Sequence, residues 1–239
     1  MLTIVILSIL NGCNMNNTIS SKDSPQSAQM ELPSEALIKY DKNNGTITYL
    51  KGENLSEALE KDEFFRGLQS RNMHADIAFA FLMAYRSSFK LMNPADELII
   101  DSITTDDLGL THIRFQHIYE GIPIWASEII IHLDRSNHVY LFQGSYIPSP
   151  EDINTIPALT EDTAFRLVVE NLRHKDFECA GCRSGLVIYP SSSNEMPRLA
   201  YRVTAAPSLS EGWTFIIDAN TGEILEKLPT VHTDGIKGK

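Results

Sequence analysis

The hydrophobic period of this chain changes from helical to alternating near residue 98, and this change constrains the fold more than any other feature. Residues 75–91 carry apolar side chains at helical spacing with no Gly or Pro among them, which predicts a buried helix ending before Asn93. The alternating segments that follow predict strands at Leu98–Thr104, Thr111–Tyr119, Glu128–Asp134 and His138–Ile147. Turns predicted at 106–109, 121–123 and 134–137 favour an antiparallel meander with the helix packed on one face.

Two shorter elements are predicted before the long helix, so that a first module begins near Leu37. The segment Thr46–Leu50 alternates like a short strand. Asn54 is a capping residue with Glu57 three positions later, which predicts a helix from there to about Leu68.

A second module is predicted after the proline-containing segment 146–150. Thr160 is a good N-cap, and Glu161 and Asp162 in the first turn favour a helix whose buried face carries Ala164, Val168 and Leu172. Strands are predicted at Gly185–Tyr189, Leu199–Ala205, Trp213–Asp218 and Glu223–Leu228, with a tight turn at 218–222. The expected fold class is therefore α+β, with two modules that are each an antiparallel sheet packed against helix.

Charge and composition exclude several classes of protein. The chain has 20 Lys and Arg against 31 Asp and Glu, a formal net charge of −11, whereas nucleic-acid-binding domains carry a basic patch. With 43% hydrophobic residues the chain can bury cores and is not disordered as a whole. No stretch approaches the ~20 apolar residues of a spanning helix, so a polytopic membrane protein is also excluded.

The N-terminus has the pattern of an export signal. Residues 2–10 are mostly apolar and are followed by Asn11-Gly12-Cys13, which resembles a bacterial lipobox whose cysteine becomes lipidated. A basic residue is missing from its start, and a simple signal peptide with an incidental cysteine is the alternative. Residues 14–34 are polar and predict a flexible tether.

The remaining two cysteines form a Cys-x-x-Cys pair at Cys179 and Cys182. A redox motif of this kind would open a helix after a strand, but this pair follows a helix and leads into a strand. In an exported protein, a small disulfide between Cys179 and Cys182 is the favoured interpretation.

No catalytic or metal-binding residues are predicted. The histidines do not form the His-Glu-x-x-His spacing of a zinc helix, and a Gly-x-Ser-x-Gly elbow and a phosphate-binding glycine loop are also missing. His112, His117, His132 and His138 lie on adjacent predicted strands, but their spacings do not place them all on one face. We therefore expect ordinary sheet histidines rather than a metal site.

Residues 106–125 resemble the fungalysin/thermolysin propeptide motif. The residues that fall on its marked positions are His112, Arg114, Phe115, Gln116, Tyr119, Gly121 and Pro123. His117 replaces the second Gln of the motif, and Ala126 fits the small residue that often follows it.

The second module resembles a PepSY domain. Leu199–Val203 matches its middle strand, and 213–225 matches its closing hairpin, with Asp218 and Gly222 in the turn. A signal, a propeptide module and a PepSY module in this order are similar to the pre-pro region of thermolysin-like zinc metalloproteases.

The resemblance implies a domain plan and a role. It places a lipoprotein-type signal at 1–13, a tether at 14–34, the propeptide domain at 35–150, the PepSY domain at 155–230 and the junction to an absent catalytic domain at 231–239. It implies a chaperone and inhibitor of a thermolysin-like catalytic domain, which is the expected partner. No cofactor is expected in this chain, since zinc and calcium belong to that absent domain.

The same resemblance implies an exported protein, either secreted or attached to the bacterial cell envelope by a lipid, with no nucleic-acid partner. The alternative is a stand-alone exported lipoprotein that binds or inhibits an envelope peptidase.

We predict that the purified chain hydrolyses no casein and holds no stoichiometric zinc, because no motif supplies metal ligands or a general base. The measurements are a casein assay and metal analysis. Hydrolysis that survives repurification and disappears with a chelator would contradict this prediction.

Overall fold

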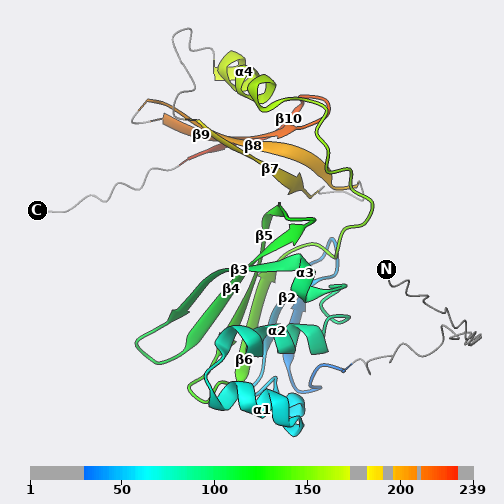
Figure 1. The fold of residues 1–239 in the computed structure, drawn as a ribbon, viewed down its shortest axis with the longest axis vertical. Coiled ribbons are helices and arrows are strands. Elements are labelled where there is room, and N and C mark those ends of the chain that lie inside the picture. Colours follow the sequence, from blue (N-terminus) through cyan, green and yellow to red (C-terminus); the bar gives the residue numbers. More distant parts are fainter. Residues whose placement is uncertain (1–29, 173–181, 191–195, 209–210, 231–239) are drawn as a thin grey trace, which may run out of the picture.

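The computed structural model describes residues 30–172, 182–190, 196–208 and 211–230. These residues form two stacked units, each with its own sheet packed against one or more helices (Figure 1), which confirms the α+β class. None of their helices has the length and apolar character needed to cross a membrane.

The first unit is an antiparallel sheet with helices on one face (Figure 1). Its strands lie in the order β1-β2-β6-β5-β4-β3. Their bounds are β1 Leu37–Tyr40, β2 Ile47–Lys51, β3 Leu98–Thr105, β4 Thr111–Tyr119, β5 Ile122–Leu133 and β6 Val139–Ser145. The predicted meander is confirmed, and β2 and β1 extend it beyond β6.

The helices bury aromatic side chains against this sheet and form the first core. They are the 3-10 helix η1 Glu57–Lys61 and the α-helices α1 Glu63–Ser70, α2 His74–Ala84 and α3 Pro94–Glu97. Phe89 stacks on Phe142 of β6 with ring centroids 4.5 Å apart, and Phe81 of α2 lies 5.9 Å from Phe89. All three side chains are fully buried, so these contacts join the helical layer to the centre of the sheet.

The second unit packs one helix on a smaller antiparallel sheet of four strands. Its elements are α4 Glu161–Leu172, β7 Arg183–Tyr189, β8 Arg198–Ser208, β9 Glu211–Asp218 and β10 Ile224–Pro229. Ala164 and Val168 of α4 are fully buried and belong to the second core with Phe215 of β9. The predicted helix and strands of this unit are confirmed to within a few residues.

Strand β5 reaches from the first sheet into the second unit (Figure 1). Ile124, near its beginning, pairs in parallel with Ile188 of β7 and is buried in the second core. The linker also passes between the cores, since Tyr146 belongs to the first core and Ile153 to the second.

Two helix predictions are wrong in extent. The helix predicted from Asn54 to Leu68 is divided into η1 and α1, because Asp62 caps α1 by accepting hydrogen bonds from the backbone N–H groups of Phe64 and Phe65. The helix predicted through residue 91 ends at Ala84 and continues as turns, with Lys90 at a φ of +55°. The tertiary position of Phe89 keeps it buried without a helix.

The turn predicted at 121–123 is also wrong. The turn residues are Glu120 and Gly121, both with positive φ of +48° and +80°, and Pro123 lies within β5 opposite Ile118. Two residues with positive φ form a type I′ turn, whose twist matches that of the flanking strands.

The tight turn predicted at 218–222 is present between β9 and β10. The Asp218 carboxylate accepts hydrogen bonds from the backbone N–H groups of Asn220 and Thr221, and Gly222 has a φ of +79°. A Cβ atom added at Gly222 would lie 3.1 Å from the side chain of Leu167 and 3.3 Å from that of Leu159.

We predict that Gly222→Ala lowers the free energy of unfolding more than Gly121→Ala does. Both changes place alanine in a left-handed conformation that costs about 1–2 kcal/mol. A Cβ at Gly222 would also press on two leucines, whereas one at Gly121 would meet nothing within 4 Å. Urea unfolding of both variants measures the difference, and equal losses would contradict the steric part of the argument.

Candidate functional site

The residues of the propeptide-like motif gather on the β4–β5 hairpin. His112, Arg114, Phe115, Gln116 and Tyr119 lie on β4, Gly121 lies in the turn and Pro123 lies on β5. The structure therefore brings all the sequence-predicted motif residues of the first unit onto one hairpin.

A bulge of four residues interrupts this hairpin. Gln116 pairs with Glu128, and Ile118 pairs with Pro123, so that His117 on β4 stands opposite residues 124–127 on β5. Ala126, inside the bulge, has a φ of +53°, which is an unfavourable conformation for a residue other than glycine.

The side-chain amide of Gln116 holds the bulge closed. Its nitrogen lies 2.9 Å from the carbonyl oxygen of His117, 3.0 Å from that of Ile124 and 2.9 Å from that of Ser127. An amide nitrogen carries two hydrogens, so one of them is shared between two of these acceptors. This single side chain therefore connects β4 to both ends of the bulge.

A buried polar group lies under the bulge. His117 is fully buried, with Nδ1 3.1 Å from the Ser127 hydroxyl and Nε2 3.8 Å from Glu97 Oε2. Burial raises the pKa of Glu97, but interactions with His117, the backbone N–H of Asn93 and the hydroxyl of Ser149 outweigh it and lower this pKa. The group thus places a carboxylate beside an imidazole next to the linker.

The outer side of the bulge contacts the second unit. The Trp125 indole N–H donates to Glu226 of β10 at 3.1 Å, and the guanidinium of Arg202 lies 6.0 Å from the Trp125 ring centroid. Near the tip, Tyr119 packs against the second core, and its hydroxyl lies 3.4 Å from the backbone N of Ile153. The hairpin tip therefore belongs to the second core as much as to the first.

Two further motif residues have structural contacts within the first unit. Phe115 is fully buried and meets the ring of Phe79 edge-on, with centroids 5.0 Å apart. Arg114 forms an exposed ion pair with Glu128 on the neighbouring strand. Exposed pairs of this kind contribute little to stability.

His112 and His132 form a pair across β4 and β5. Their Nδ1 atoms are 2.6 Å apart, and His112 Nε2 lies 3.4 Å from Asp106 Oδ2. Burial, together with the nearby His112, lowers the pKa of His132 to about 4. His138 lies apart, in the β5–β6 turn beside Asp134. Among the described residues, no three His, Cys, Asp or Glu side chains are arranged to hold a metal ion.

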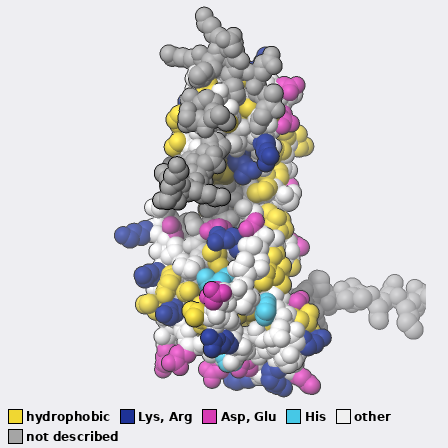
Figure 2. Space-filling model, turned by 90° about the vertical axis from the view of Figure 1, so that its left-hand side faces the viewer, with side chains coloured by type: hydrophobic (Ala, Val, Ile, Leu, Met, Phe, Trp, Pro, Cys, Tyr) yellow, Lys and Arg dark blue, Asp and Glu magenta, His cyan; other side chains and the backbone are white. Residues whose placement is uncertain are grey.

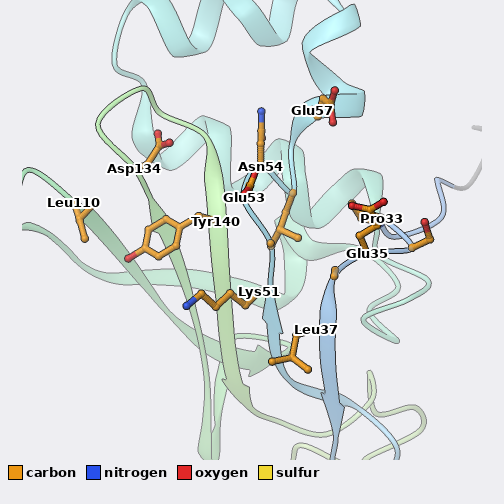
Figure 3. Close-up of a pocket in the computed structure, with 14 residues that line it drawn as sticks. Pro33, Glu35, Leu37, Lys51, Glu53, Asn54, Glu57, Leu110, Asp134 and Tyr140 are labelled. Atoms are coloured by element: carbon orange, nitrogen blue, oxygen red, sulfur yellow. The ribbon is translucent and has the colours of Figure 1, made fainter.

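A groove lies at the far end of the first unit, away from the hairpin tip. It has a volume of about 1010 Å³ and is lined by residues of β1, β2, the segments beside them and β6, including Glu35, Leu37, Lys51, Glu53 and Tyr140 (Figure 3). Its carboxylates come from separate segments, and we assign no ligand to it.

The structure tests some of the residues predicted in the second unit and none of those predicted at the N-terminus. Burial raises the pKa of Asp218, but the N–H groups of Thr221 and Asn220 and the nearby Arg198 hold it below its usual value, as expected of a turn carboxylate. Cys182 is disulfide-bonded. Cys179 and the predicted lipidation residue Cys13 lie outside the described residues, so the Cys179–Cys182 pairing and lipidation stay predictions.

The surface carries charges of both signs. On the face shown in Figure 2, Lys and Arg side chains are interspersed with Asp and Glu over the lower part of the molecule.

Several residues of the site were missed by the sequence analysis. Trp125, Ser127, Glu97 and Glu226 carry its polar contacts, yet only their positions in space identify them. A Trp directly before Ala126, in a strand that then alternates, was the one available signal of a bulge.

Comparisons with known proteins agree with the motif. Residues 96–146 match the model of the Fungalysin/Thermolysin Propeptide Motif. Bacillolysin of Bacillus amyloliquefaciens is 30% identical over 155 residues, covering 56% of this chain and 27% of that protein. Thermolysin of Alicyclobacillus acidocaldarius subsp. acidocaldarius is 26% identical over 170 residues, covering 67% of this chain and 31% of that protein. The chain spans less than a third of the length of these curated relatives.

One solved structure is also similar. The Bacillus megaterium YpeB C-terminal domain matches with a TM-score of 0.40 and 14% identity, covering 82% of this chain and 77% of that chain.

We predict that stability falls as the pH falls from about 6.5 to about 4, because the unfolded chain takes up a proton at His132 in this range and the folded protein does not. The contribution of His132 is about 2–3 kcal/mol at neutral pH. Urea unfolding at several pH values measures it. The variant His132→Gln should flatten the dependence and His74→Gln should keep it; the same slope in both variants would contradict the assignment.

Proposed function

Because residues 96–146 carry the fungalysin/thermolysin propeptide motif in a chain homologous to the propeptide regions of thermolysin and bacillolysin, we propose that this protein is the pro-region of a thermolysin-like zinc metalloendopeptidase. In this role it assists the folding of the catalytic domain and holds it inactive until cleavage. The partner is that catalytic domain.

The observation that carries the proposal is how much of each protein the similarity covers. The matched residues make up more than half of this chain but less than a third of each protease. The motif residues of this chain hold a hairpin together, with their polar groups directed to backbone carbonyls, an ion pair and a partly buried carboxylate. These contacts support a binding role rather than a catalytic one.

The physical logic of such a role is kinetic. A protease that survives through a high unfolding barrier also has to cross a high barrier when it folds. A pro-region that binds the folding enzyme lowers this barrier by preferential binding, and the same surface can then cover the active-site cleft.

The first sheet offers one surface for such binding. Within the described residues β3 pairs with β4 alone, and its Ile99, Ile100 and Ile103 are all more than 40% exposed. A free strand edge with exposed apolar side chains suits pairing with an extended segment of a partner. The chain after Pro229 is a second proposed contact, because an extended peptide suits a protease cleft.

In this proposal zinc and calcium belong to the catalytic domain, and we expect this chain to bind neither. Export by the N-terminal signal and lipid attachment at Cys13 are part of the same proposal. They place the pro-region outside the cytoplasm, where the protease would fold.

We predict that the full chain slows hydrolysis of a peptide substrate by the thermolysin-like protease of the same organism. Inhibition should saturate near one chain per enzyme. Deleting residues 231–239 should weaken inhibition and leave the fold intact, because β10 ends at Pro229 and Thr230 closes it with a hydrogen bond to Gly212. Inhibition constants and circular dichroism of both chains are the measurements.

A matched control separates loss of binding from loss of fold. Gly222→Val should lose inhibition together with the closing β9–β10 hairpin, whereas the deletion should lose inhibition alone. Protease activity unchanged by a large excess of folded chain would overturn the proposal, and a stand-alone lipoprotein binding other envelope components would then be favoured.

A further inference from the structure

We infer that the bulge 124–127 of β5 is a latch that couples the two cores, and that Gln116 is the residue that positions it. The latch makes the second core depend on a strand of the first unit. It is a property of the folded chain and goes beyond the proposed function.

The bulge divides its side chains between the two cores. The hydroxyl of Ser127 lies beneath the bulge, within hydrogen-bond distance of His117 Nδ1. Both side chains are almost fully buried in the first unit. Ile124 is 1% exposed and belongs to the second core, where it pairs with Ile188. Four consecutive residues therefore carry contacts to both units.

The second unit holds the bulge from its other side. Trp125 packs against Val187, Ala200 and Ile216, which lie on the face of the second sheet opposite α4. Its indole N–H donates to Glu226 of β10 at 3.1 Å, so this one side chain makes both apolar and polar contacts with the second unit. Ile124 and Trp125 thus contact opposite faces of the same sheet.

The conformation of the bulge requires outside support. Ala126 has a φ of +53°, and a non-glycine residue in this region is strained by about 1–2 kcal/mol. Such strain persists where the surroundings determine the backbone. Here the Gln116 amide supplies three contacts to backbone carbonyls, at His117, Ile124 and Ser127.

The junction beside the latch is not filled by packing. A hollow of about 220 Å³ lies there, lined by Thr46, Tyr146 and Ser127 from the first unit and by Trp125 and Pro190. The bulge bridges the two units next to a space without side chains. The bulge therefore carries the coupling between the cores together with Tyr119 at the hairpin tip and the linker residue Ile153.

Hydrogen exchange with mass spectrometry tests this inference on the full chain. The variant Gln116→Leu keeps the size of the side chain and removes its donors. We expect exchange to rise about tenfold or more in residues 116–128 and in the second-core strands β7, β8 and β9. Exchange in β2 and β6 should change much less.

Two control variants separate the latch from general destabilisation. Gln143→Leu makes the same chemical change on β6, where it removes a side-chain hydrogen bond to His132 within the first unit, and should leave exchange in β7–β10 unchanged. Phe142→Leu weakens the first core directly and should raise exchange in β2 and β6. A second latch variant, Trp125→Ala, keeps Gln116 and should raise exchange in β7–β10.

The outcomes are distinct. A rise confined to residues 98–145 in a folded Gln116→Leu variant would overturn the latch, and so would an equal rise across both cores that stops short of complete loss of protection. If Gln116→Leu loses all protection because it does not fold, Trp125→Ala becomes the deciding variant. Unchanged exchange in β7–β10 of Trp125→Ala would then overturn the inference.

The latch also bears on inhibition, and this part rests on the proposed function. Gln116→Leu should raise the inhibition constant about tenfold, whereas Gln143→Leu should not. The exchange measurement uses no protease, so failure of the proposed function and failure of the latch are told apart.

Discussion

The side-chain amide of Gln116 is the interaction on which the arrangement of the two units depends. A strand can leave its ladder only if the freed backbone groups find other partners. Gln116 contacts three carbonyl oxygens around the bulge, which allows β5 to turn Ile124 and Trp125 toward the second unit. Without a long amide side chain at this position, a regular hairpin would keep its residues in the first sheet.

This view gives physical reasons for the residue types of the motif. Gly121 supplies the positive φ of the type I′ turn, Phe115 fills the first core and Gln116 holds the bulge. His117, where the motif has a second Gln, directs its ring to Ser127 and Glu97 beneath the bulge. These motif residues thus determine the shape of the backbone at the hairpin.

The hydrophobic period predicted most strands and helices of this fold but not the contacts between its two units. Alternation located β3, β4 and β6, and the cap at Thr160 located α4, because such local patterns depend on short-range geometry. The helix after Ala84 was overextended, since Phe89 is buried by tertiary packing rather than by helical position. The contact of Ile124 with Ile188 joins residues far apart in sequence, and no periodicity indicates it.

A coupled pair of units matters physically to a protein that binds through both. Two units joined by the linker 147–160 alone would lose relative freedom on binding, and that loss would weaken the complex. A latch formed during folding removes this freedom before the partner arrives, so contacts made by each unit add to the affinity more fully. The strain at Ala126 is then a modest cost, of about 1–2 kcal/mol, of keeping the second core aligned with the free edge of β3.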